Sequence, residues 1–252
     1  MNLYEITFSP TGGTERVARC LSAALSGSAR KIALTDRTQV FSSFAFSEED
    51  VCLVSVPSFA GRVPAPAAER IRSLRGNGAR AVAVVVYGNR AYDDTLLELT
   101  DALAEAGFRP FAAVAALAEH SILRQYATGR PNDNDLRQLT SFGRQIAEAL
   151  DGEPVRPAVP GKYPYRAIGP GVKPVSTEGC VRCGACAKAC PVGAIPPENP
   201  SAFDRDACFS CMRCIGICPA GARILPEEVL SALNQRIGPH LAGYRENELF
   251  LD

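Results

Sequence analysis

Residues 180–191 read CVRCGACAKACP, and residues 208–219 read CFSCMRCIGICP. Both stretches follow one pattern, in which four cysteines are spaced C-x₂-C-x₂-C-x₃-C and a proline comes next. Three thiolates this close together suit three corners of an iron–sulfur cubane, whereas the fourth cysteine lies a helical turn further on and reaches the neighbouring cluster. The spacing therefore predicts two [4Fe-4S] clusters that exchange their fourth ligand.

This crossed arrangement assigns every cysteine of the two stretches to one cluster. The predicted ligands are Cys180, Cys183, Cys186 and Cys218 for cluster one, and Cys208, Cys211, Cys214 and Cys190 for cluster two. A pair of zinc sites is the weaker alternative, because zinc ligands usually come as separated C-x₂-C pairs. A disulfide framework is also disfavoured, because Met1–Phe8 has neither the basic start nor the long apolar core of a secretory signal.

The double motif resembles the bacterial two-cluster ferredoxins, and it predicts a domain of that kind over residues 175–225. Eight of the ten cysteines lie between residues 180 and 218, so we expect a reducing compartment that builds clusters, most simply the cytoplasm. Lys plus Arg and Asp plus Glu both number 27, and no basic stripe indicates nucleic acid as a partner. The longest apolar runs, 79–87 and 111–118, are too short to span a membrane.

Residues 1–150 alternate short apolar runs with longer amphipathic ones, which predicts an α/β domain with a doubly wound parallel sheet. Five strands suit the flavodoxin-like order 2-1-3-4-5. The predicted strands are Leu3–Phe8, Arg30–Leu34, Asp50–Val56, Ala79–Tyr87 and Arg109–Ala118, and the predicted helices are Thr14–Leu25, Ala65–Leu74, Asp93–Ala106 and Asn132–Leu150.

A loop of hydroxyls and glycines joins the first predicted strand to the first predicted helix. Such a loop offers backbone N–H groups and a positive helix dipole to a phosphate, without any Lys or Arg of its own. The alternative is a plain helix cap with Thr14 as the N-cap residue. The loop resembles the phosphate loop [S/T]-x-T-G-x-T of flavodoxins, and this resemblance implies that FMN is bound by Ser9, Thr11, Gly12, Gly13 and Thr14.

Two further loops fall where flavodoxins hold the isoalloxazine ring. Each has an aromatic residue for stacking, Phe59 or Tyr92, and a glycine that lets the backbone approach the ring. Gly61 is the candidate for a peptide facing flavin N5, and Arg62 or Arg90 could neutralise a reduced flavin or be an ordinary surface charge. The expected ring-binding residues are Ser58, Phe59, Ala60, Gly61, Arg62, Gly88, Asn89, Arg90 and Tyr92.

The segments VPSFAGRVP, YGNRAYDD and AEHS together are similar to a family of flavodoxin–ferredoxin fusion proteins of anaerobes. The resemblance implies FMN and two [4Fe-4S] clusters but no particular substrate. The chain departs from ordinary flavodoxins in having only Asp93 and Asp94 where they place an acidic cluster near the ring. His120 is a weak candidate for a proton donor at the flavin, and a structural role at the strand end is favoured.

Residues 151–174 form a proline-rich linker, in which Tyr163, Tyr165 and Ile168 are candidates for packing on a domain. The last region, residues 226–252, has a predicted helix at Pro226–Ile237 and a tail that is expected to dock. The predicted function is electron transfer between the clusters and FMN for redox partner proteins. One alternative is an FMN-dependent oxidoreductase that reduces a small organic substrate; another is a non-redox, partner-binding module with structural clusters. No G-x-G-x-x-G follows a strand, which argues against a nicotinamide cofactor.

Overall fold

The computed structural model describes residues 2–251 and has a six-stranded sheet with the order β2-β1-β3-β4-β5-β8. The first five strands are parallel and confirm the predicted order 2-1-3-4-5. Their bounds are Leu3–Thr7 for β1, Arg30–Ala33 for β2, Val51–Pro57 for β3, Arg80–Tyr87 for β4 and Arg109–Leu117 for β5. Each lies within two residues of the predicted strand at both ends.

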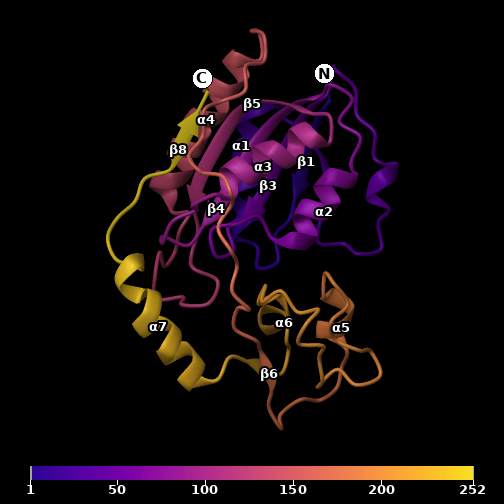
Figure 1. Cartoon of the computed structure of the whole chain (residues 1–252), viewed down its shortest axis with the longest axis vertical. Helices are drawn as coiled ribbons and strands as arrows, with labels where there is room; N and C mark the ends of the chain where they lie inside the picture. The colour runs from indigo at the N-terminus through magenta and orange to yellow at the C-terminus, as the bar shows by residue number, and fades with distance from the viewer. Residues whose placement is uncertain (1, 252) are drawn as a thin grey trace.

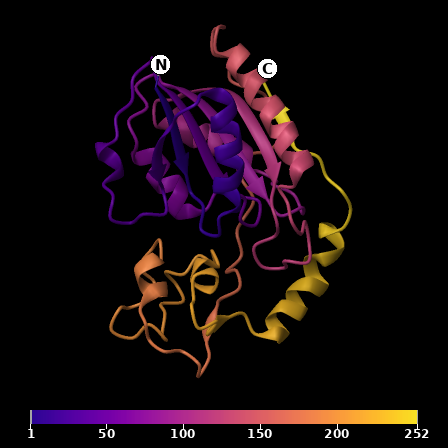
Figure 2. The same cartoon turned by 180° about the vertical axis from the view of Figure 1, so that it is seen from behind.

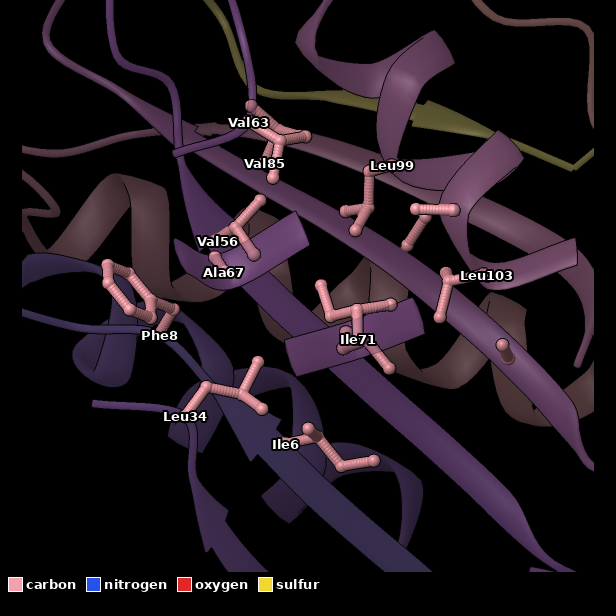
Figure 3. Packing of buried hydrophobic residues seen from close by; sticks show 14 of the residues in the cluster. Ile6, Phe8, Leu34, Val56, Val63, Ala67, Ile71, Val85, Leu99 and Leu103 are labelled. Atoms are coloured by element: carbon pink, nitrogen blue, oxygen red, sulfur yellow. The ribbon is translucent and has the colours of Figure 1, made fainter. Parts of the chain in front are cut away.

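Helices cover both faces of this sheet, since successive strand residues point to opposite sides. Val82 and Val84 pack with one pair of helices, whereas Ala83 and Val85 pack with the other. The first pair is α1 (Gly13–Leu25) with α4 (Asp133–Ala149), and the second is α2 (Ala65–Ser73) with α3 (Thr95–Glu105). Figure 3 shows the second core, where Ile71, Leu99 and Leu103 meet the strand side chains. A 3₁₀ turn, η1, covers Phe41–Ser43.

The cysteine-rich region forms a small unit at the carboxyl ends of the parallel strands (Figures 1 and 2). It contains a two-stranded antiparallel ribbon and two short helices. One helix follows the first two cysteines of each motif. The bounds are Val175–Ser176 for β6, Ala185–Ala189 for α5, Arg213–Gly216 for α6 and Arg223–Ile224 for β7. Together with the sheet order, this gives the predicted fold class, a flavodoxin-like domain followed by a ferredoxin-type domain.

Residues 151–174 are extended and run along α3. Tyr163 and Tyr165 both donate to Asp101, and the backbone N–H groups of Lys162 and Arg166 donate to Asp94 at 3.1 and 2.7 Å. The linker is therefore fastened to the first domain, as its aromatic residues suggested, although Ile168 is exposed.

The C-terminal region returns to the first domain (Figure 1). Helix α7 (Glu227–Leu241) continues four residues beyond the predicted end and passes through Pro239. It reaches Leu241, which is buried with Leu123 and Leu233. The chain then adds β8 (Glu248–Phe250) antiparallel to β5, an edge strand that the sequence did not predict. Among residues 2–251, no helix is both long and apolar enough to cross a membrane.

Candidate functional site

The eight motif cysteines line two separate cavities. Cys180, Cys183, Cys186 and Cys218 line one, and Cys190, Cys208, Cys211 and Cys214 line the other. These are the two crossed ligand sets expected from the spacing, and all ten cysteines of the chain are free thiols. No three His, Cys, Asp or Glu side chains within residues 2–251 converge on a position for a single metal ion.

The sequence repeat is reproduced in the backbone around the cavities. Arg182 and Ser210, at equivalent places in the two motifs, both have a positive φ, and so do Gly184 and Met212 just before α5 and α6. Residues in this left-handed region turn successive N–H groups into a concave surface that favours negative charge. The conformation is costly for Met212, which has a side chain, so the surrounding fold must impose it.

The two cavities differ in exposure and in what surrounds the sulfur atoms. Cys183 of the first is exposed, and the Ala222 N–H donates to the Cys218 sulfur at 3.2 Å. Slight burial acts to raise the pKa of Cys218, but backbone N–H groups of residues 220–223 outweigh it and hold the pKa below its usual value. In the second, burial raises the pKa of Cys211 to about 12 and that of Cys214 to about 11. These thiols are therefore protonated at neutral pH, and bound iron would favour their ionised form.

The second cavity lies against the carboxyl edge of the sheet. Phe209, next to Cys208, packs on Phe8 and Phe59. Its ring centroid lies 5.9 Å from that of Phe8 and 6.2 Å from that of Phe59. The Arg213 guanidinium donates to the carbonyl of Pro10 at 3.2 Å and weakly to that of Ser9 at 3.4 Å. Arg70 of α2 donates to the carbonyl of Pro191 at 2.5 Å. The ferredoxin-type domain is therefore docked on the loops where the flavin was expected.

The expected phosphate loop follows β1 directly. Gly12 is the N-cap of α1 with φ +92°, so Thr14 lies inside the helix and the alternative with Thr14 as N-cap is wrong. The Ser9 hydroxyl accepts the Glu15 N–H at 3.0 Å, which closes the loop. Within residues 2–251, the N–H groups of residues 11–14 have no protein acceptor. The loop thus presents four unpaired donors at a helix N-terminus, which suits a phosphate.

The loop after β3 turns back at Ala60 and Gly61, both with positive φ, and the Phe59 and Arg62 backbones bond each other. A Cβ on Gly61 would lie 2.1 Å from the Asp93 carboxylate, so only glycine fits there. The Gly61 carbonyl accepts the Asp94 N–H, which ties the two expected ring loops together. Ser58 bonds Thr95 through their hydroxyls at 2.7 Å.

The Arg62 guanidinium is bound by residues of α3 and of the linker. It binds both carboxylate oxygens of Glu98, at 2.7 and 2.8 Å, and the carbonyl of Arg166 in the linker. Arg90 pairs with Asp93. Both guanidiniums therefore already have protein carboxylates as partners and hold loops in place.

Two residues that were expected to contact the flavin ring have other partners. Tyr92 is buried, packs edge-on against Tyr87 and donates to Glu248 of β8, so its ring is not free to stack on a flavin. The Asn89 side chain is also buried and donates to the carbonyls of Leu241 and Gly243 at 2.6 and 2.8 Å. The sequence pattern missed these roles because it does not show where the C-terminal tail binds.

His120 follows the end of β5 and packs on Gly88, where any Cβ would collide with it. Its Nδ1 accepts the N–H groups of Ile122 and Leu123 at 3.2 and 3.0 Å. Burial, aided by nearby Arg90, lowers the pKa of His120 to about 4. The imidazole is therefore neutral at pH 7 and organises its own loop, as the structural interpretation expected.

Sequence analysis did not select Phe209, Arg213 or Arg70 as functional residues. Phe209 and Arg213 occupy positions between motif cysteines that the spacing leaves unspecified, and Arg70 lies on the polar side of a helix. The lack of a cation in the phosphate loop did not point to them, because neutral donors were expected to hold the phosphate there.

Among family models, the match falls on the cysteine-rich part of the chain. The family described as "4Fe-4S dicluster domain" matches residues 179–222. Among solved structures, a flavodoxin from the domain Archaea is 16% identical with a TM-score of 0.45, over 60% of this chain and 100% of that one. A Streptococcus pneumonia TIGR4 flavodoxin is 19% identical, with a TM-score of 0.40 and coverage of 58% and 98%. An NADH:FMN oxidoreductase is 17% identical, with a TM-score of 0.43 and coverage of 61% and 91%.

The sequence matches no curated protein. The order of the five parallel strands, taken with the match at 179–222, defines the chain as a flavodoxin-like domain joined to a ferredoxin-type 4Fe-4S domain.

Proposed function

We propose that the protein transfers electrons between two [4Fe-4S] clusters and FMN, and so converts between one- and two-electron steps for partner proteins in a reducing compartment such as the cytoplasm. The observation that carries this proposal is the docking of the second cysteine cavity on the flavin-type loops. Phe209 lines that cavity and also contacts Phe8 and Phe59 at the end of the sheet.

The cysteine sets fit clusters, and the loop at residues 9–14 fits a phosphate. When bound, cubanes supply one-electron chemistry and a flavin supplies one- or two-electron chemistry. The exposed Cys183 puts the first cavity toward external partners, whereas the second cavity faces the first domain. This arrangement favours a route from the surface through cluster one and cluster two to the flavin.

The residues of the chain have three roles in this proposal. The cysteines bind the clusters, the N–H groups of residues 11–14 bind the phosphate, and the contact of Phe209 with Phe8 and Phe59 excludes water between the two centres. Tyr92 and Asn89 hold the C-terminal tail instead of the ring.

The test is anaerobic purification followed by a visible spectrum and by assays of iron and released flavin. The proposal expects about eight iron atoms and one FMN per chain, and bleaching of both chromophores on reduction. Eight iron atoms without flavin, and without flavin uptake, would favour the non-redox, partner-binding module. Rapid reoxidation of the flavin by one organic compound would favour the oxidoreductase.

A further inference from the structure

Arg213 lies at the junction of the two domains, between two ligands of the second cavity and beside the expected phosphate loop. It is the first residue of α6, and Cys211 and Cys214 flank it in the sequence. Its guanidinium contacts the carbonyls of Ser9 and Pro10, which are about 200 residues earlier in the chain. Its Nε is buried and has no hydrogen-bond partner within residues 2–251.

The phosphate loop itself contains no cation. The N–H groups of residues 11–14 can hold a phosphate by neutral donors, but they leave its charge uncompensated apart from the helix dipole. The arginine nearest in sequence, Arg16, is exposed in the first turn of α1, and Glu15 beside it adds a negative charge. Within residues 2–251, Arg213 is the cation whose side chain donates to carbonyls of the loop.

We infer that Arg213 completes the flavin phosphate site from the ferredoxin-type domain, so that the site belongs to both domains. The inference rests on the proposed FMN function and adds where the positive charge comes from. A guanidinium suits this role because it stays charged and can offer two parallel donors to phosphate oxygens. Its Nε, which lacks a protein acceptor, is available as one such donor.

A consequence is that phosphate binding and domain docking reinforce each other. A phosphate held by both the loop and Arg213 links α6 to α1, and therefore links the cluster-two ligands to the first domain. A flavin without phosphate would bind the same ring loops but would not strengthen this link.

The experiment compares FMN with riboflavin, since the two differ only in the phosphate. Flavin is removed from the anaerobic, cluster-loaded protein, and the affinity for each flavin is measured by fluorescence quenching. Inorganic phosphate is titrated separately as a competitor. We expect wild type to prefer FMN, and Arg213→Gln to reduce the preference about tenfold or more while riboflavin affinity stays unchanged. Arg213→Lys keeps the charge and should retain part of the preference.

Arg236→Gln is the matched control, because Arg236 is an exposed arginine on α7 that lines neither cavity. It should leave the preference for FMN intact, and iron content should be unchanged in every variant. As a second measurement, FMN but not riboflavin should slow hydrogen exchange in residues 208–218 of wild type, and Arg213→Gln should abolish this difference.

Four results would separate the possible failures. Wild type that takes up neither flavin would refute the proposed function. If wild type and Arg213→Gln preferred FMN to the same extent, only the role of Arg213 would be refuted. Loss of the preference in Arg16→Gln but not in Arg213→Gln would assign the charge to α1 and also overturn the inference. Competition by inorganic phosphate without any FMN preference would identify an anion site unrelated to flavin.

Discussion

Single residues at the carboxyl edge of the sheet are held by partners from distant segments. Glu98 on α3 binds Arg62 through both oxygens and also accepts the Val63 N–H at 2.9 Å. His120, by contrast, is held by the backbone of its own loop. Such residues give the edge a defined shape before any cofactor binds, which reduces the entropic cost of binding.

His120 gives a test of this rigidity by pH. Its folded-state pKa of about 4 lies below the ordinary value of 6.5, so the unfolded chain binds a proton first as the pH falls. Stability is therefore full above pH 6.5 and is lost between pH 6.5 and about 4, by at most roughly 1.4 kcal/mol per pH unit. Urea unfolding midpoints across this range should show the decline, and His120→Gln should flatten it. An identical slope in both proteins would contradict the prediction.

The cysteine ligands give a second test. Cys218→Ser should perturb cluster one and leave cluster two, whereas Cys190→Ser should do the opposite, because the proposed crossed assignment makes each the fourth ligand of the other motif's cluster. Loss of one cluster would lower iron from about eight to about four atoms per chain. EPR spectra of the reduced proteins should distinguish the two variants.

Cys20→Ser is the control for these ligand variants, since Cys20 lies on α1 away from both cavities. If Cys218→Ser affected only the cluster of Cys208, Cys211 and Cys214, the crossed assignment would be wrong.

Among the elements, β8 is the one that binds the tail to the first domain. Asn247, just before it, accepts the Leu117 N–H at 2.9 Å and donates to Asp135 at 3.0 Å and Gln138 at 2.7 Å. Asp135 is buried and ion-paired with Arg130, which in turn donates to the carbonyl of Arg245. One side chain therefore connects β5, α4 and the tail.

Asn247→Ala should destabilise the first domain by about 1–3 kcal/mol, because it leaves the buried Leu117 N–H without an acceptor. Hydrogen exchange at the Leu117 amide should accelerate accordingly. Gln138→Ala removes a more exposed partner of the same residue and should have a smaller effect. Equal exchange rates in wild type and Asn247→Ala would show that β8 does not protect this edge.

At the scale of the whole molecule, three connections fasten the ferredoxin-type domain: the linker on α3, the docking surface around Phe209, and α7 with β8 (Figures 1 and 2). The docking brings the second cavity to the flavin-type loops and leaves Cys183 of the first exposed. A fixed position suits electron transfer, because the distance between the centres does not change with each turnover.

Removing residues 242–252 should loosen this assembly. The full chain should have a radius of gyration of about 18 Å, as expected for one compact unit of its length. The truncated protein should be larger in solution scattering, since the chain after α7 loses the hydrogen bond from Asn89 to Gly243 and the pairing of β8 with β5. Iron content serves as the control for intact clusters. An unchanged radius would mean that the linker and the Phe209 contacts suffice.

Local spacing determined what the sequence alone could show. The cysteine motifs, the alternation of strands and helices and the loop at residues 9–14 all depend on residues close together in the chain, so the fold class and the candidate ligands could be predicted. The docking of Phe209 and Arg213, the strand β8 and the burial of Tyr92 join segments up to about 200 residues apart. No short-range pattern encodes such pairings, because they depend on which surfaces become complementary after each domain has folded.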